Sequence, residues 1–226
     1  MKTNPFRSLT LVLGLAALLG GVAPVHAGDT APADVAAMEG GKALPAGAWT
    51  ITFPWMAKQS VAFLGDADVE RTAGLVNFGN PGTSPLGTVK LDGKGGGAGV
   101  FTVPLADVTT GVEGRDEHLR SETWLDAKKF PEITYTIAKV EMLKPTVARV
   151  TGTWKMHGVE KAVVSLANVR FIDKMDHFDA PLGIARLKTK VSLSLKAYGV
   201  DNPYVGSPAV ADEWTVEVVV LGVISK

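Results

Sequence analysis

The amino-acid sequence predicts an all-β protein built from antiparallel strands, and three observations support this fold class. About eight segments alternate apolar and polar residues with a period of two, which is typical of strands with one buried face. Turn-forming residues separate these segments. No predicted helix is long enough to connect parallel strands, so the strands form either a closed barrel or a sandwich of two sheets.

The first 27 residues predict a secretory signal peptide. Lys2 and Arg7 precede an apolar run from Leu9 to Ala23, and small residues lead to a cleavage site after Ala27. A membrane anchor is the weaker alternative, because this run is shorter than the roughly 20 residues that a spanning helix needs. We therefore expect a periplasmic or secreted protein without a transmembrane span.

Two segments follow the cleavage site. Residues 28–47 are rich in Ala, Gly and Pro and predict a flexible leader, and residues 48–226 predict one β-barrel domain. The whole chain has 23 basic and 23 acidic side chains, which argues against a nucleic-acid partner. It has no cysteine, which excludes disulfides, thiol catalysis and zinc–thiolate sites.

The first half of the domain contains the less regular strands. Alternation is clear over 49–53 and 60–64, weak over 65–99, and clear again over 100–105. In the last of these runs Phe101, Val103 and Leu105 share a face. Pro104 places that run at a sheet edge or marks a bulge, because proline cannot donate a hydrogen bond to a neighbouring strand.

The second half alternates more regularly, around a tight turn at His157-Gly158. The residues predicted to share faces, run by run, are Ile133, Tyr135 and Ile137; Val150, Gly152, Trp154 and Met156; Val164 and Leu166; Leu187, Thr189, Val191, Leu193 and Leu195; and Trp214, Val216, Val218 and Val220. An eight-stranded barrel with such bulky residues inside is either filled by them or just wide enough for one slim ligand.

A polar segment, residues 115–131 (RDEHLRSETWLDAKKFP), interrupts the strands. Asp116 and Arg120 are four residues apart, as are His118 and Glu122, so each pair shares one face of a helix. We expect Pro131 to stop this helix. The segment therefore predicts a short charged helix that caps or plugs the β structure.

Residues 115–135 and the later block GTWKMHGVEK (152–161) resemble the two signature motifs of the YceI-like family. This resemblance implies an extended antiparallel lipocalin-like barrel of about eight strands, exported to the periplasm, with a short helix capping one end. It also implies that the interior holds an isoprenoid or isoprenoid-quinone chain along the barrel axis, without a catalytic step. The helix would then close one end of the apolar interior.

The sequence departs from the family pattern at several polar positions. Thr52 replaces an aspartate, Lys58 and Gln59 replace a His-Ser pair, and Leu195 and Ala197 replace an arginine and an acidic residue. The family's fold is expected here, whereas the polar end of the ligand is expected to be recognised differently.

The predicted ligand-binding residues are Phe63, Phe101, Val103, Leu105, His118, Leu119, Trp124, Tyr135, Ile137, Trp154, Met156, Leu193, Leu195 and Val218. The expected partner is a long-chain isoprenoid lipid, with no other cofactor, and a homodimer is left open. One alternative is a structural or stress-response partner protein with a filled core. The other is an enzyme centred on His118, although the sequence offers only Ser121 as a neighbouring nucleophile.

No metal site is expected. Asp173, Asp176, His177 and Asp179 form an acidic cluster, but their spacing matches no calcium-binding loop. Asp is also a common turn residue, so a solvated loop explains this cluster.

Overall fold

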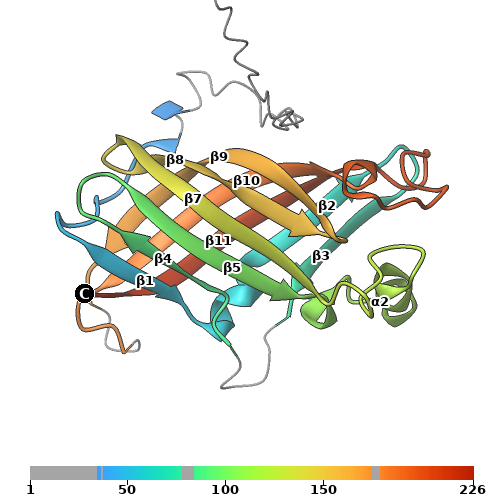
Figure 1. The fold of residues 1–226 in the computed structure, drawn as a ribbon, viewed down its shortest axis with the longest axis horizontal. Helices are drawn as coiled ribbons and strands as arrows, with labels where there is room; N and C mark the ends of the chain where they lie inside the picture. Colours follow the sequence, from blue (N-terminus) through green and yellow to red (C-terminus); the bar gives the residue numbers. More distant parts are fainter. Residues whose placement is uncertain (1–34, 37, 78–83, 175–178) are drawn as a thin grey trace, which may run out of the picture.

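The computed structural model describes residues 35–36, 38–77, 84–174 and 179–226 (Figure 1). The predicted signal peptide therefore lies outside the described residues, as do Asp176 and His177. The elements in chain order are β1 (Trp49–Phe53), the 3-10 helix η1 (Trp55–Ser60), β2 (Val61–Asp66), β3 (Arg71–Val76), β4 (Gly87–Leu91), β5 (Gly97–Pro104), the 3-10 helix η2 (Leu105–Asp107), β6 (Val108–Thr109), α2 (Glu113–Arg120), β7 (Glu132–Lys144), β8 (Val147–Met156), β9 (Val159–Ile172), β10 (Ile184–Ser194), the 3-10 helix η3 (Lys196–Tyr198) and β11 (Glu213–Ser225).

Eight of these strands close into an antiparallel barrel, as predicted. The ring runs β1-β4-β5-β7-β8-β9-β10-β11 and closes where β11 pairs with β1. Ile51 lies opposite Ile224 at this closure. Ring closure pairs both edges of the sheet, so β1 and β11 satisfy each other's backbone groups.

β11 is long enough to pair with two strands in succession. Its C-terminal part pairs with β1, and its N-terminal part pairs with β2, where Val216 lies opposite Phe63. Pro54 and η1 separate β1 from β2, since proline cannot continue the ladder. Beyond β2, strands β3 and β6 extend the sheet toward the end of the barrel where α2 lies (Figure 1). We call this the α2 end.

The predicted helix forms, but it is shorter than expected. α2 ends at Arg120, and the Ser121 hydroxyl donates to the His118 carbonyl at a distance of 2.6 Å. Glu122 therefore lies outside the helix, and the expectation that Pro131 stops it was wrong. Among the described residues no helix is both long and apolar enough to cross a membrane.

Two details of register change which side chains face inward. β7 contains a bulge between Ile137 and Lys139, which shifts the alternation so that Val140 becomes buried. On β9, Val163 lies opposite the inward Gly152 and belongs to the core. Val164 and Leu166 share a face, as expected, and it is the outward one, because successive residues of a strand point to opposite faces.

Pro104 lies where β5 loses one of its two neighbours. The pairing of β5 with β4 ends at Phe101, whereas its pairing with β7 continues to Pro104. The amide of Thr102 still donates to the carbonyl of Leu86. The prediction of a sheet edge at Pro104 therefore holds for one side of the strand.

Several aromatic rings inside the barrel lie over glycines of neighbouring strands. A Cβ atom added to Gly152 would lie 2.8 Å from the ring of Tyr135, and one added to Gly65 would lie 2.6 Å from the ring of Trp214. The glycines leave the space that these rings occupy. This arrangement lets large aromatic side chains fit inside a barrel of eight strands.

The predicted leader contributes to the fold from Met38 onward. The buried Asn168 side chain donates to the Met38 carbonyl at 2.7 Å and to the Thr146 carbonyl at 3.1 Å. Lys42 forms a bridge with Phe171, and its amine lies 2.6 Å from the Asp173 carboxylate. Residues 38–47 thus pack on the barrel, and we call them the strap.

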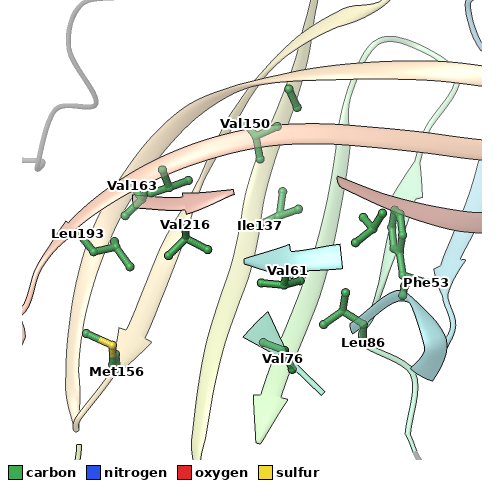
Figure 2. Packing of buried hydrophobic residues seen from close by; sticks show 14 of the residues in the cluster. Phe53, Val61, Val76, Leu86, Ile137, Val150, Met156, Val163, Leu193 and Val216 are labelled. Atoms are coloured by element: carbon green, nitrogen blue, oxygen red, sulfur yellow. The ribbon is translucent and has the colours of Figure 1, made fainter. Parts of the chain in front are cut away.

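The interior of the barrel is apolar along its length (Figure 2). Phe53 and Leu86 lie together on one side of the view, and Met156 and Leu193 lie on the other (Figure 2). Ile137 and Val150 lie between these groups. Toward α2 the inward side chains no longer fill the barrel, and the space that they leave is the candidate site.

Candidate ligand-binding site

A cavity of about 700 Å³ occupies the α2 end of the barrel. The residues that line it are Val61, Phe63, Glu70, Thr72, Val76, Val103, Val108, Val112, Gly114, Arg115, Glu117, His118, Leu119, Trp124, Leu125, Ile133, Trp154, Met156, Leu193, Leu195, Val210, Trp214 and Val216. Most of these are aliphatic or aromatic, and a cavity of this size is within the range of small-molecule sites.

Inward-facing residues of the strands form the cavity wall. Phe63 and Trp214 face each other across the β2–β11 pair, with ring centroids 5.7 Å apart. Ile133 and Trp154 come from β7 and β8, on another part of the wall. All four residues point inward yet are only half-buried, because they face the cavity instead of other side chains.

The cover of the cavity comes from α2 and the turns that follow it. Leu119 and Trp124 project from this segment into the lining. The Leu125 amide donates to the Leu119 carbonyl at 3.1 Å, which folds the turns back onto the helix. Asn202 donates to the Thr123 carbonyl at 3.2 Å and ties the turns to the loop before β11.

Asp116 fixes α2 to β6 and the residues after it. Its carboxylate accepts hydrogen bonds from the Thr109 hydroxyl, the Thr110 amide at 2.7 Å and the Thr110 hydroxyl at 2.6 Å. Burial alone would raise the pKa of Asp116, but these hydrogen bonds, with the positive charge of Arg120, hold it below its usual value of 3.8. The side chain is therefore a charged anchor.

Two arginines complete the attachment of α2. Arg120 donates to the backbone carbonyls of Leu105 at 3.2 Å and Val108 at 2.8 Å. Arg115 forms an ion pair of 2.8 Å with Glu70, in the turn between β2 and β3. An ion pair and backbone hydrogen bonds thus hold the helix at the end of the barrel.

The charged groups at the rim do not form a recognisable catalytic set. His118 is exposed at the cavity rim, and the neighbouring Ser121 hydroxyl is used to cap α2. Within the described part of the chain, no three His, Cys, Asp or Glu side chains come together as metal ligands. A second histidine, His157, lies in the predicted turn between β8 and β9, with its Nδ1 3.2 Å from the Tyr198 carbonyl.

Nine of the predicted ligand-binding residues line this cavity: Phe63, Val103, His118, Leu119, Trp124, Trp154, Met156, Leu193 and Leu195. The other five lie elsewhere. Phe101, Tyr135, Ile137 and Val218 lie deeper in the barrel, and Leu105 is buried in η2 instead of continuing the strand. Their inward orientation was predicted, but not their depth along the barrel axis.

Sequence reasoning missed several lining residues. Trp214 and Val216 belong to a strand face that the alternation identifies, so they could have been included. Val76 comes from the weakly alternating part of the sequence, and Val108 comes from a strand of two residues, too short to show alternation. Only the paired sheet brings those two next to α2.

A second cavity, of about 520 Å³, lies at the opposite end of the barrel. The strap covers it, and its lining includes Leu44, Trp49, Leu91 and Val140. None of its lining residues belongs to the cavity at the α2 end. The two hollow regions are thus separate.

Residues 58–221 match the family model described as the YceI-like domain. Among curated proteins, the UPF0312 protein of Pseudomonas putida (strain GB-1) is 33% identical over 91 residues, covering 39% of this chain and 45% of that protein. A UPF0312 protein of Pseudomonas savastanoi pv. phaseolicola is 34% identical over 80 residues, covering 34% of this chain and 42% of that protein. The chain thus spans less than half the length of these curated relatives.

Two solved structures share the fold. The crystal structure of Burkholderia cenocepacia BcnA has a TM-score of 0.58 at 18% sequence identity, covering 74% of this chain and 95% of that one. A polyisoprenoid binding domain from Saccharophagus degradans, implicated in plant cell wall breakdown, has a TM-score of 0.53 at 12% identity, covering 78% and 98%. At these identities, the likeness concerns the fold alone.

Proposed function

Because the chain belongs to the YceI-like domain family, we propose that it binds an isoprenoid-type lipid in the cavity at the α2 end, without a catalytic step. The observation that carries this proposal is the cavity itself. It holds about 700 Å³ inside a barrel whose wall is almost entirely aliphatic and aromatic. An apolar chain is the occupant that such a wall favours, because burial contributes roughly 25 cal/mol per Å² of apolar area.

The charged rim gives the proposed ligand an orientation. Glu70, Arg115, Glu117 and His118 lie around the mouth, whereas Met156 and Leu193 lie inside and are buried. A lipid with a polar end would keep that end at the rim, where water and these side chains can hydrogen-bond to it. The apolar chain would then extend inward from α2.

Export to the periplasm remains part of the proposal. It rests on the signal-peptide pattern of residues 1–27. A lipid carrier outside the cytoplasm would shield its ligand's chain from water between membranes. Cell fractionation of the native host, followed by detection of the protein, tests this location.

Two tryptophan substitutions on β5 test the binding site. Val103 lines the cavity, whereas Val100 points outward on the same strand and is 45% exposed. We expect Val103→Trp to fill the cavity and to reduce the affinity for a prenyl lipid at least about tenfold, since a loss of about 1.4 kcal/mol in binding is tenfold. Val100→Trp serves as the matched control and should bind like the unmodified protein.

Native mass spectrometry and quenching of tryptophan fluorescence by added prenyl alcohol provide the measurement. Circular dichroism and thermal unfolding verify that both variants are folded. Equal affinity for the two folded variants would contradict the placement of the ligand in this cavity. A protein that retains no lipid and binds no added prenyl alcohol would contradict the function itself.

A further inference from the structure

On five strands the lining of the cavity ends partway along the strand. The last lining residues away from α2 on β5, β7, β8, β10 and β11 are Val103, Ile133, Trp154, Leu193 and Val216. The next inward-facing residues on these strands, two positions farther along, are Phe101, Tyr135, Gly152, Val191 and Val218, and none of them lines the cavity. We call this second set the floor.

The two aromatic residues of the floor lie over glycines of neighbouring strands. The Phe101 ring covers Gly87, where an added Cβ would lie 2.6 Å from it, and the Tyr135 ring covers Gly152 at 2.8 Å. Burial raises the pKa of Tyr135 to about 12, with the Ser165 hydroxyl opposing part of this rise, so the phenol stays neutral at physiological pH. The floor therefore carries no charge.

Close packing continues behind the floor. Phe101 contacts Phe53, with ring centroids 5.1 Å apart, and Phe53 is only 1% exposed. Ile137 and Val220 are 4% and 0% exposed. Among the described residues, none lines both the cavity at the α2 end and the one under the strap, and these closely packed side chains lie between the two.

We propose that the floor sets the length of the lipid chain that this protein accepts. The proposal rests on the proposed function and specifies its ligand class: short prenyl chains that lie wholly within one half of the barrel. At roughly 30 Å³ for each water-sized group, the cavity holds about 20 such groups, or about four five-carbon isoprene units. A longer chain leaves its excess outside, at the rim near α2.

Deeper entry would require the packed half of the barrel to rearrange. Moving the Phe101 ring displaces Phe53, which is surrounded by core residues, and moving the Tyr135 ring uncovers the backbone at Gly152. Protein interiors pack as densely as organic crystals, so such displacements are resisted. The floor consequently acts as a fixed stop.

A length series of prenyl alcohols with two, three, four, six and eight isoprene units tests this stop on the unmodified full chain. Affinity should rise about tenfold with each added unit while the chain still enters apolar surroundings, and should change less than about threefold beyond about four units. An affinity that keeps rising to eight units would overturn the stop while leaving lipid binding intact. If no alcohol of any length binds, the proposed function itself fails.

Substitutions in the floor and next to it test whether the floor sets the accepted chain length. We call the chain length beyond which affinity stops rising the plateau. Phe101→Ala removes a floor side chain and should move the plateau to chains about one isoprene unit longer. Val103→Phe narrows the space above the floor and should move it to chains about one unit shorter. Phe171→Leu is the control, because Phe171 points inward near the strap end and lies outside the cavity lining. Its plateau should equal that of the unmodified protein.

The outcome does not depend on a single variant. Phe101→Ala is expected to lower stability, so each protein is first checked by thermal unfolding. If Phe101→Ala fails to fold, Val103→Phe and the series on the unmodified protein decide the matter. A plateau that stays in place in the folded floor variants, or one that moves equally in Phe171→Leu, would show that the floor does not set the chain length.

Discussion

Asp116 is a buried carboxylate whose partners explain its charge. Three hydrogen bonds from Thr109 and Thr110 compensate for its removal from water. An unpaired buried charge would be costly, so the two threonines and the aspartate act as one unit. From the sequence, Asp116 is only one of several charges in a polar segment, because its partners lie six and seven residues upstream in another element.

We expect Asp116→Ala to lower the free energy of unfolding by about 2 kcal/mol at neutral pH, because the threonine hydroxyls and the Thr110 amide lose their acceptor. Glu113→Ala is the control: it removes an exposed carboxylate from the same turn of α2 and should cost less than about 0.5 kcal/mol. Urea unfolding measures both. Equal losses for the two variants would contradict the anchoring role.

The lowered pKa of Asp116 makes this contribution depend on pH. A carboxyl whose pKa is lower in the folded state stabilises the protein above its unfolded pKa, here 3.8, and this stabilisation is lost as the pH falls through the folded value. The difference in stability between the unmodified protein and Asp116→Ala should therefore be constant near pH 7 and shrink below pH 3.8. A difference that grows on acidification would contradict the direction of the shift.

α2 shows how an element can be predicted in kind but not in extent. The 115–131 segment indicates a helix because its charges are spaced by four, and the structure contains one. Its end depends on Ser121, whose hydroxyl competes for the His118 carbonyl, and this local capping bond ends the helix well before Pro131. The chain from Ser121 to Phe130 is held instead by turns, including Asp126 with a φ of 44°.

The two arginines of α2 should differ in their energetic contributions. Arg120→Met removes donors to three backbone carbonyls and is expected to cost about 2 kcal/mol of unfolding free energy, since charged hydrogen bonds of this type contribute more than neutral ones. Arg115→Met breaks an ion pair whose side chains are 39% and 45% exposed, so its cost should stay below about 1 kcal/mol. Thermal and urea unfolding of both variants decide between this ranking and its reverse.

The strands show the same limit on prediction. The regular alternation of 150–156 and 214–220 correctly indicates which residues point inward. Alternation cannot reveal the bulge in β7, and on β9 the run of apolar residues at 162–164 supports either orientation. Only pairing with Gly152 decides that Val163, not Val164, belongs to the core.

At the scale of the whole molecule, the barrel was predictable and its division into two halves was not. Alternation, the absence of long predicted helices and the family motifs together indicate a closed barrel. Whether its interior is hollow or filled depends on how rings such as Phe101 and Tyr135 meet glycines on neighbouring strands. The answer is both: the interior is filled directly behind the floor and hollow in front of it.

The separation of the halves predicts that the two ends of the barrel respond independently to substitution. Asn168→Ala should loosen the strap and cost about 2 kcal/mol of stability, without changing prenyl-alcohol affinity. Asn202→Ala should instead lower that affinity severalfold, because Asn202 holds the turn that carries Trp124 over the cavity. Hydrogen exchange of residues 38–47, together with titration of both variants, checks this; equal losses of affinity would contradict it.

The split of the first strand by η1 has a mechanical consequence. In the filled half, β1 joins β4 to β11, and a continuous ring of backbone hydrogen bonds fixes the circumference. In the hollow half, no ladder joins β5 to β3 or β6 among the described residues; the Asn77 amide donates to the Asp107 carbonyl, and Arg120 bonds to neighbouring carbonyls there. Widening the filled half would require breaking a strand pair, whereas widening the hollow half at this seam would break only these few hydrogen bonds. We therefore expect the hollow half to tolerate changes in ligand width more readily than the filled half does.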